Sequence, residues 1–160
     1  LAVTSDLIVG FPGETEADFE ATLEVVAEAG YDSAYLFVFS PREGTEAAEM
    51  TGDFVDHAVS VSRFERLQEV LQRSSRMRYA ARVGRIEEIL VEGPSKREPS
   101  QVTGRTRQNK IVHLAADEGL RAGAYAQVEI TGAAAHYLHA ELVEVTAAPL
   151  HRRQIPVASA

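Results

Sequence analysis

The sequence predicts two parts of different fold class, an α/β segment followed by a small all-β domain. Two observations favour this division. Apolar runs at residues 7–9 and 33–39 flank a helical pattern, which gives the order strand, helix, strand of a right-handed βαβ unit. From Val83 onward, short strand patterns alternate with turn residues. A long helical pattern lies between the two parts.

Both ends of the first helix are marked in the sequence. Thr15 is the expected N-cap, and acidic residues follow it in the first turn, where the helix dipole favours negative charge. Gly30 is the expected stop. The predicted apolar face of this helix consists of Phe19, Leu23, Val26 and Ala27.

The long helical pattern runs from about residue 56 to 82 and has Phe64, Leu67 and Leu71 as its apolar stripe. Six arginines and only two acidic residues occupy positions 63–82. We interpret the arginines as a solvated helix face, and a phosphate-facing role is the alternative. The arginines are Arg63, Arg66, Arg73, Arg76, Arg78 and Arg82.

Five short strand patterns make up the second part. Gly and Pro steps separate them, and five such strands in about 65 residues predict a closed or nearly closed barrel of the OB type. The strand patterns cover residues 85–93, 101–106, 110–114, 124–131 and 137–145. The expected domains are therefore 1–82 and 83–147, and residues 148–160 are expected to form a flexible tail.

Composition limits the possible functions. The chain of 160 residues has a net charge of −8, and residues 1–62 hold 13 acidic side chains against one basic side chain, Arg42. With no cysteine, the chain has no thiolate ligand of its own. No apolar run is long enough for a membrane span and no signal-peptide pattern occurs, so we expect a cytoplasmic protein. The start without Met, inside a strand pattern, suggests a piece of a longer protein.

Two loops rich in Gly and Pro follow the first two strands. The sequence "DLIVGFPGETE" has neither the Walker spacing nor the GxGxxG pattern, so it does not indicate a nucleotide-phosphate loop. Gly10 and Gly13 nevertheless fall at the C-terminal end of a parallel strand, where α/β proteins bind ligands, and "FSPREGT" falls on the same edge. The two loops are either a ligand-binding rim or simply tight turns. Glu14 is expected to order its turn.

A basic stretch stands out in the second part. "GRTRQNKIV" places Arg105, Arg107 and Lys110 within six positions of an otherwise acidic chain. These cations either contact nucleic-acid phosphates or pair with acidic residues on neighbouring strands. The candidate acidic partners are Glu87, Glu88 and Glu129.

Three sequence strings resemble a known family. "TSDLIVGFPGETEADFEATLEVV", followed by "FVFSPREGTEAAEM", resembles the C-terminal half of the radical S-adenosylmethionine (SAM) domain of methylthiotransferases. "EGPSKREPSQVTGRTRQNKIVHL" resembles the TRAM domain appended to those enzymes. The resemblance extends from about residue 4 to 145.

The resemblance implies a partial (β/α) barrel that binds SAM and two [4Fe–4S] clusters, followed by a TRAM domain that grips the anticodon stem-loop of tRNA. The implied reaction adds a methylthio group to C2 of a prenylated adenosine next to the anticodon. The alternatives are relatives that act on threonylcarbamoyladenosine or on a ribosomal protein, and a standalone RNA-binding TRAM module with a structural α/β appendage. The cluster cysteines of the family are missing here, so we expect this chain by itself to be inactive and to bind no cofactor.

The resemblance also implies site residues. The implied SAM contacts are Ile8, Gly10, Phe39, Ser40, Pro41 and Arg42. The implied RNA contacts are Lys96, Arg97, Arg105, Thr106, Arg107, Asn109, Lys110 and His113. His113, Tyr125 and Tyr137 are candidates for base stacking; packing is the favoured interpretation for Tyr125, and both interpretations stay open for His113.

The truncated parallel sheet is expected to self-associate through its exposed edge.

Overall fold

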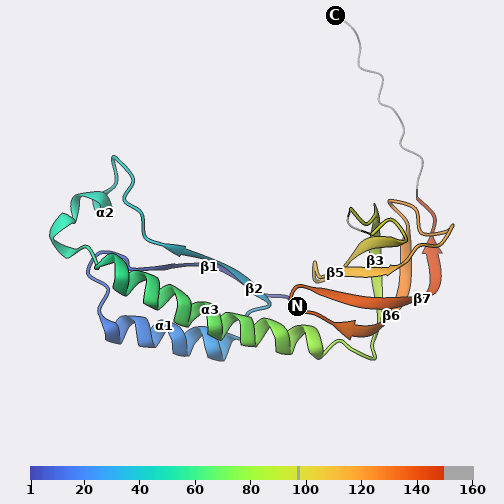
Figure 1. Cartoon of the computed structure of the whole chain (residues 1–160), viewed down its shortest axis with the longest axis horizontal. Helices are drawn as coiled ribbons and strands as arrows, with labels where there is room; N and C mark the ends of the chain where they lie inside the picture. The colour runs from blue at the N-terminus through green and yellow to red at the C-terminus, as the bar shows by residue number, and fades with distance from the viewer. Residues whose placement is uncertain (97, 150–160) are drawn as a thin grey trace, which may run out of the picture. The chain divides into compact units, whose positions relative to one another are not determined.

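The computed structural model describes residues 1–96 and 98–149 and divides the chain into two compact units. The first unit is Leu1–Arg78 and the second begins at Tyr79. Arg97 and nearly all of the expected tail lie outside the described residues. Figure 1 shows a strand pair with helices in the first unit and a β-barrel in the second.

The first unit is the predicted βαβ unit followed by the long helix. Strands β1 (Thr4–Val9) and β2 (Ser33–Val38) pair in parallel, with Thr4 opposite Ser33 and Val9 opposite Val38. Helices α1 (Glu16–Ala29) and α3 (His57–Ala80) cover one face of this pair (Figure 1). The buried core between these layers consists of Val9, Phe19, Val26, Leu67 and Leu71.

Helix α1 begins and ends where the sequence predicts. The Thr15 hydroxyl accepts a hydrogen bond from the Asp18 backbone N–H, and the Asp18 carboxylate accepts one from the Thr15 N–H at 2.9 Å, which completes a capping box. Hydrogen bonds from the Thr15 side chain and then its backbone lower the pKa of Asp18. Gly30 ends the helix with φ of 59°, a left-handed conformation that suits glycine. The predicted apolar face is wrong at Ala27, which is exposed.

The arginines of α3 correct one prediction. Arg73 and Arg76 are exposed as expected, but Arg63 is only 5% exposed, so a solvated face is the wrong interpretation for that residue. Arg78 also has a specific partner, because its Nε donates to the Gly30 carbonyl at 2.9 Å. Two short elements, α2 (Glu46–Glu49) and a 3-10 turn η1 (Thr51–Asp53), precede α3.

The second unit confirms the predicted barrel. Its five strands close in the order β3-β4-β5-β7-β6, and every neighbouring pair is antiparallel except β5 and β7, which run parallel. The strands are β3 (Ile86–Pro94), β4 (Gln101–Thr106), β5 (Ile111–Ala115), β6 (Tyr125–Ala133) and β7 (Tyr137–Ala147).

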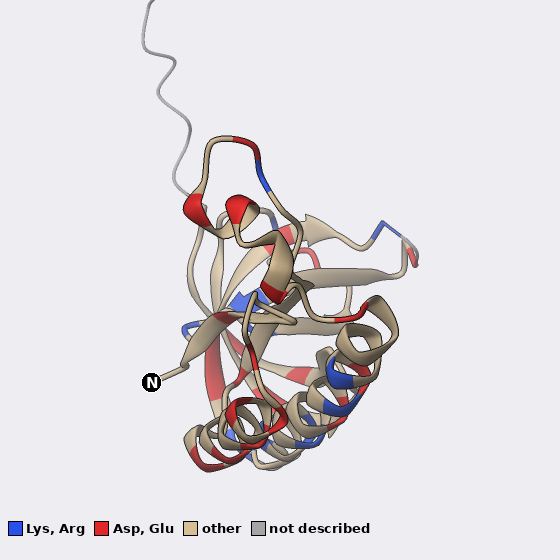
Figure 2. Ribbon diagram, turned by 90° about the vertical axis from the view of Figure 1, so that its left-hand side faces the viewer, with Lys and Arg blue, Asp and Glu red and all other residues tan. Residues whose placement is uncertain are grey.

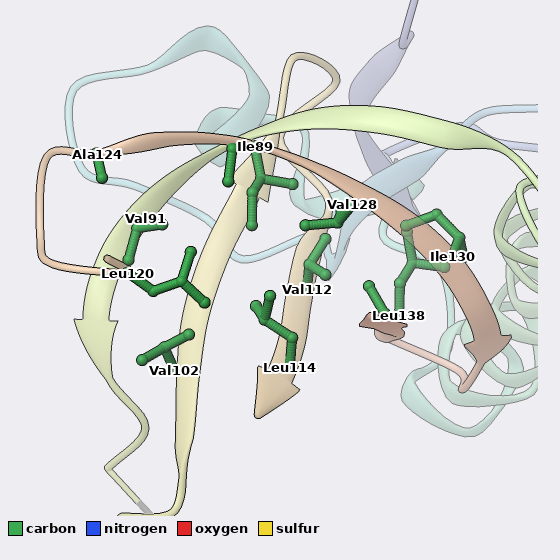
Figure 3. Packing of buried hydrophobic residues seen from close by; sticks show 12 residues of the cluster. Ile89, Val91, Val102, Val112, Leu114, Leu120, Ala124, Val128, Ile130 and Leu138 are labelled. Atoms are coloured by element: carbon green, nitrogen blue, oxygen red, sulfur yellow. The ribbon is translucent and has the colours of Figure 1, made fainter. Parts of the chain in front are cut away.

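Alternating side chains fill the barrel interior, and Figure 3 shows them converging from all five strands. Ile89, Val112, Val128 and Leu138 are fully buried there. Gly104 permits a close approach of β3 and β4, because a Cβ at this position would lie 2.9 Å from the Ile89 Cδ1. Because the side chains that point into the core are fixed in this way, the residues on the outer face of each strand are fixed as well.

The last turn of α3 contributes to the second unit through Tyr79. The Tyr79 hydroxyl donates to the His136 carbonyl at 3.2 Å, and the Lys110 ammonium lies 4.0 Å from the centroid of the Tyr79 ring. Arg82, just after the helix, pairs with Glu87 at 2.6 Å. Lys110 and Arg82, two of the basic residues singled out in the sequence, therefore have structural roles within the barrel unit.

Candidate functional site

The basic stretch forms the turn between β4 and β5. Thr106 closes this turn, since its hydroxyl accepts hydrogen bonds from the backbone N–H groups of Lys110 at 3.2 Å and Gln108 at 3.3 Å. Asn109 has φ of 61°, in the left-handed region that Asn tolerates better than most residues. Thr106 is 5% exposed. Its position therefore favours a structural role over the RNA contact that the resemblance implies.

Arg105 and Arg107 both lie on the surface in ion pairs. The Arg105 Nε donates to Glu92 at 2.8 Å, and its Nη1 donates to the Asn109 side-chain oxygen at 3.0 Å. Arg107 pairs with Glu88 at 2.9 Å. Pairing with acidic residues of a neighbouring strand was one of the two expectations, and Glu88 was among the candidate partners.

These two ion pairs are exposed enough to exchange partners. The side chains of Arg105 and Glu92 are 37% and 45% exposed, and those of Arg107 and Glu88 are 76% and 26% exposed. Exposed pairs of this kind contribute about 0–1 kcal/mol to stability. A phosphate can therefore replace either carboxylate at small energetic cost, and the pairing does not by itself remove the arginines from an interface.

The other predicted cations are not part of this arginine pair. Lys110 is 3% exposed and contacts the Tyr79 ring. Lys96 is exposed in the turn after β3, and Arg97 lies outside the described residues. Among the predicted cations in residues 1–96 and 98–149, the ones exposed at the β4–β5 turn are Arg105 and Arg107.

A cluster of three rings lies on the outer face of β5 and β7. The Tyr137 ring is 5.1 Å from that of His113 and 5.2 Å from that of His139, centroid to centroid, both in edge contacts. The Thr103 hydroxyl hydrogen-bonds the His113 Nδ1 at 3.3 Å. His139 was missed by the sequence reasoning, although its two-residue spacing from Tyr137 is the strand signal that could have found it. Tyr125 is 44% exposed on β6 and lies outside the core, so packing on the strand surface stays the prediction for it.

The ring cluster affects the charge of His113. Partial burial is the main cause that lowers the pKa of His113, and the neighbouring His139 adds to the effect. The lowered pKa favours the neutral form of His113 at pH 7, in which its ring presents an uncharged aromatic surface.

In the first unit, Glu14 orders the loop after β1 as predicted. Its carboxylate accepts a hydrogen bond from the Gly10 N–H at 2.7 Å and pairs with the Arg63 guanidinium at 2.8 Å. Gly10 has φ of 70°, and a Cβ there would lie 2.3 Å from the Ser60 Oγ on α3. Glycine is thus required at position 10 by both the backbone conformation and the packing of α3.

Arg63 belongs to a network of charges that joins α3 to the start of α1. It pairs with Glu16 at 3.2 Å, and Arg66 pairs with both Glu16 and Glu20. The two guanidinium groups lie 5.5 and 4.8 Å from the centroid of the Phe19 ring. The hydrogen bond from Arg66 is the main cause that lowers the pKa of Glu16. Figure 2 shows acidic residues, in red, along α1 and basic residues, in blue, along α3.

The C-terminal ends of β1 and β2 form the rim at which the resemblance implies that SAM binds. The Phe39 N–H donates to the Val9 carbonyl at 2.8 Å, and the Phe39 ring makes edge contacts with Phe11 at 5.3 Å and Phe54 at 5.9 Å. Ile8 lies opposite Phe37 in the sheet, and both are about half exposed. Ser40, Pro41 and Arg42 follow as an exposed segment.

The residues present differ in how well they fit the implied cofactors. The exposed apolar and aromatic groups at the rim suit an adenine ring, whereas a chain without cysteine does not supply the ligands of an iron–sulfur cluster. Within residues 1–96 and 98–149, no group of three or more His, Cys, Asp or Glu side chains is arranged to hold a metal ion. No helix in the described part of the chain is long and apolar enough to cross a membrane.

The buried Arg63–Glu14 pair generates a stability prediction. We expect Arg63→Met to lower the free energy of unfolding of the first unit by about 3–5 kcal/mol, because it leaves a nearly buried carboxylate without its counter-ion. Arg63→Lys should recover only part of the loss, because lysine lacks the fork that reaches Glu14 and Glu16 together. Urea denaturation of the whole chain measures the effect. Arg73→Met, at an exposed position of the same helix, is the control, and equal losses at both positions would contradict the assignment.

The lowered pKa of His113 generates a pH prediction. Below about pH 6.5 the unfolded chain binds a proton that the folded chain takes up only at lower pH, so the free energy of unfolding should decrease as the pH falls from 7.5 to 5.5. His113→Gln should show a smaller decrease. Denaturant titrations at the two pH values test this. An unchanged decrease in His113→Gln would contradict it.

Comparisons with known proteins give one family match and a set of similar sequences. Residues 80–143 match the TRAM domain family. The chain is similar to proteins named tRNA-2-methylthio-N(6)-dimethylallyladenosine synthase. It is 46% identical to the protein of Moorella thermoacetica over 90% of the chain. The identity is 49% over 91% of the chain for a Thermoanaerobacter species and 43% over 89% for a Janthinobacterium species. It spans 32%, 30% and 32% of those relatives, about a third of their length. The chain is therefore homologous to about a third of each of these synthases, and its residues 80–143 match the TRAM domain.

Proposed function

We propose that the chain is part of a tRNA methylthiotransferase and that its TRAM domain holds the anticodon stem-loop of the substrate. In this proposal the whole enzyme adds a methylthio group to C2 of a prenylated adenosine next to the anticodon. The observation that carries the proposal is the combination of two exposed arginines and an aromatic cluster on the outer surface of the barrel. The names of the homologues support tRNA as the partner, and a tRNA partner favours a cytoplasmic protein.

Local charge matters more than the net charge for this proposal. The chain is acidic overall, at −8, but residues 1–62 carry 13 acidic side chains against one basic one, so the remaining residues have a net charge of +4. Exposed charges are screened over about 10 Å at moderate ionic strength, so a phosphate responds to the nearby arginines. Arg107, with 76% of its side chain exposed, is the better placed of the two for a first contact.

For the first unit we propose a share of the SAM site. Main-chain and side-chain groups of Ile8, Gly10 and Phe39 would contact the adenine, and the segment of Ser40, Pro41 and Arg42 would close over the ribose. The exposed rim at the ends of β1 and β2 supports this assignment. The cluster ligands would have to come from cysteines outside this sequence.

A second candidate function is a standalone RNA-binding module with a structural α/β appendage. The absence of cysteine from the sequence favours it. The sequence encoded upstream of Leu1 separates the two candidates, because a CxxxCxxC motif in frame supports the enzyme and its absence supports the module. Assays of the complete gene product on prenylated adenosine, threonylcarbamoyladenosine and ribosomal protein would then separate the remaining substrates.

The arginine pair gives the test of RNA binding. Arg105→Ala combined with Arg107→Ala should weaken tRNA binding and reduce the slope of log affinity against log salt by about 1.4, at about 0.7 per single-stranded phosphate contact. The control removes the same charge at two exposed sites on α3, through Arg73→Ala with Arg76→Ala. Filter binding at several salt concentrations measures the slopes.

Two further variants separate RNA contact from barrel stability. Glu92→Gln should strengthen tRNA binding, because it removes the carboxylate that competes with phosphate for Arg105. Lys110→Met should lower the melting temperature without changing the salt slope, since Lys110 is buried against Tyr79. A large loss of stability in the double arginine variant, with its salt slope unchanged, would argue for ion pairs that only stabilise the barrel.

We also propose that the isolated chain self-associates through its first unit. The face of β1 and β2 away from the helices exposes Ile8, Tyr35 and Phe37, with Tyr35 73% exposed. A two-stranded parallel sheet also leaves both edges without a neighbouring strand in the described residues. Light scattering should show a mass that increases with concentration, and Phe37→Lys should reduce the increase. A constant monomer mass up to high concentration would contradict the proposal.

A further inference from the structure

The closed barrel aligns the ring cluster and Arg105 on one face. Arg105 lies opposite Ile111, and Ile111 lies opposite Tyr137, so these residues form one row across β4, β5 and β7. Thr103, His113 and His139 form the next row in the same way. Because positions two apart on a strand point to the same side, both rows face outward from the barrel.

The ring cluster does not belong to the hydrophobic core. The residues of the barrel core include Leu138, which lies between Tyr137 and His139 in the chain, but none of the three rings. Tyr137 keeps 37% of its surface exposed although it touches two imidazole rings. Interplanar angles of 80° and 83° show that neither histidine stacks in parallel on the tyrosine. A parallel stacking partner for Tyr137 is therefore not supplied by the cluster itself.

The surroundings of the cluster suit a nucleotide. Neighbouring strands lie about 4.8 Å apart, so the Cα atoms of Arg105 and Tyr137 are separated by about 10 Å across β5. When the Arg105 side chain leaves its exposed pair with Glu92 of β3, at small energetic cost, it can cover part of that distance toward a phosphate while a base occupies the tyrosine. The Thr103 hydroxyl holds the His113 ring in place through its hydrogen bond. Proteins bind the unpaired bases of single-stranded RNA with a planar, uncharged ring beside a cation, and Tyr137 and Arg105 provide this combination here.

We propose that Tyr137, flanked by His113 and His139, is the stacking site for one unpaired RNA base whose backbone phosphate pairs with Arg105. The proposal rests on the RNA-binding function proposed above and names the feature of RNA that this face selects. A base within a continuous A-form duplex is stacked on its neighbours and cannot occupy the site, whereas a loop nucleotide can. The site accordingly favours RNA with unpaired bases over a blunt duplex.

The sequence makes a direct spectroscopic test possible. The chain contains no tryptophan, so Tyr137→Trp introduces a single fluorescent reporter at the proposed site. The probes are a ten-nucleotide oligoadenylate and a blunt duplex of the same strand with oligouridylate. We expect the oligoadenylate to quench the tryptophan fluorescence and the duplex to leave it unchanged. The affinity of Tyr137→Trp for the oligoadenylate should be similar to that of the unaltered protein. Tyr125→Trp, at an exposed tyrosine of β6, is the matched control and should not be quenched.

An affinity measurement tests the stacking contribution. Tyr137→Ile keeps a residue that suits a strand but removes the aromatic face, and it should weaken oligoadenylate binding about 5- to 150-fold. The salt slope should be unchanged because no charge is lost. Tyr125→Ile should bind like the unaltered protein, and circular dichroism with thermal melting checks that both variants are folded.

The outcomes separate this inference from the proposed function. If Tyr137→Ile binds oligoadenylate normally while the double arginine variant loses affinity and salt slope, RNA binding stands and the stacking site is overturned. If the unaltered protein binds neither tRNA nor oligoadenylate, both proposals are overturned. If Tyr137→Ile does not fold, the fluorescence of Tyr137→Trp decides: quenching by the single strand alone supports the site, and no quenching, or equal quenching by the duplex, overturns it.

Discussion

The strand register of the closed barrel is the constraint on which the proposed interface depends. Five strands of fixed pairing leave each position with one orientation, and a slip of a single residue would exchange the inner and outer faces of a strand. The parallel pairing of β5 with β7 places Ile111 beside Tyr137 and His113 beside His139, although these residues are distant in sequence. Core packing and surface chemistry are thereby coupled, because Val112 and Leu138 are buried on one side while the ring cluster is formed on the other.

A different interaction organises the first unit. The Arg63 guanidinium reaches the Glu14 carboxylate from α3, and that carboxylate in turn holds the Gly10 N–H at the end of β1. One buried ion pair thus connects the long helix, the start of α1 and the loop that would line a SAM site. The edge contacts of Phe39 with Phe11 and Phe54 extend the same rim with aromatic groups. The geometry of this rim therefore depends on a contact between residues that are far apart in sequence.

Local signals allowed much of this structure to be predicted, and long-range contacts account for the errors. The capping box at Thr15, the Gly30 stop and the alternating barrel strands each have a signature within a few residues. The burial of Arg63 has none, because its acidic partners lie in the loop after β1 and at the start of α1, and the six arginines look alike along the sequence. The sequence groups Lys110 with the surface cations for the same reason, since only the fold brings it to the Tyr79 ring.

The most direct test of this account is the location of bound RNA on the protein. Amide chemical shifts of the whole chain, measured during titration with an anticodon stem-loop RNA, report which residues are affected. The account predicts that the largest changes occur at Arg105, Arg107 and His113 and at the start of β7, and that the exposed arginines of α3 change little. Changes concentrated on α3, with the outer face of β4, β5 and β7 unaffected, would contradict it.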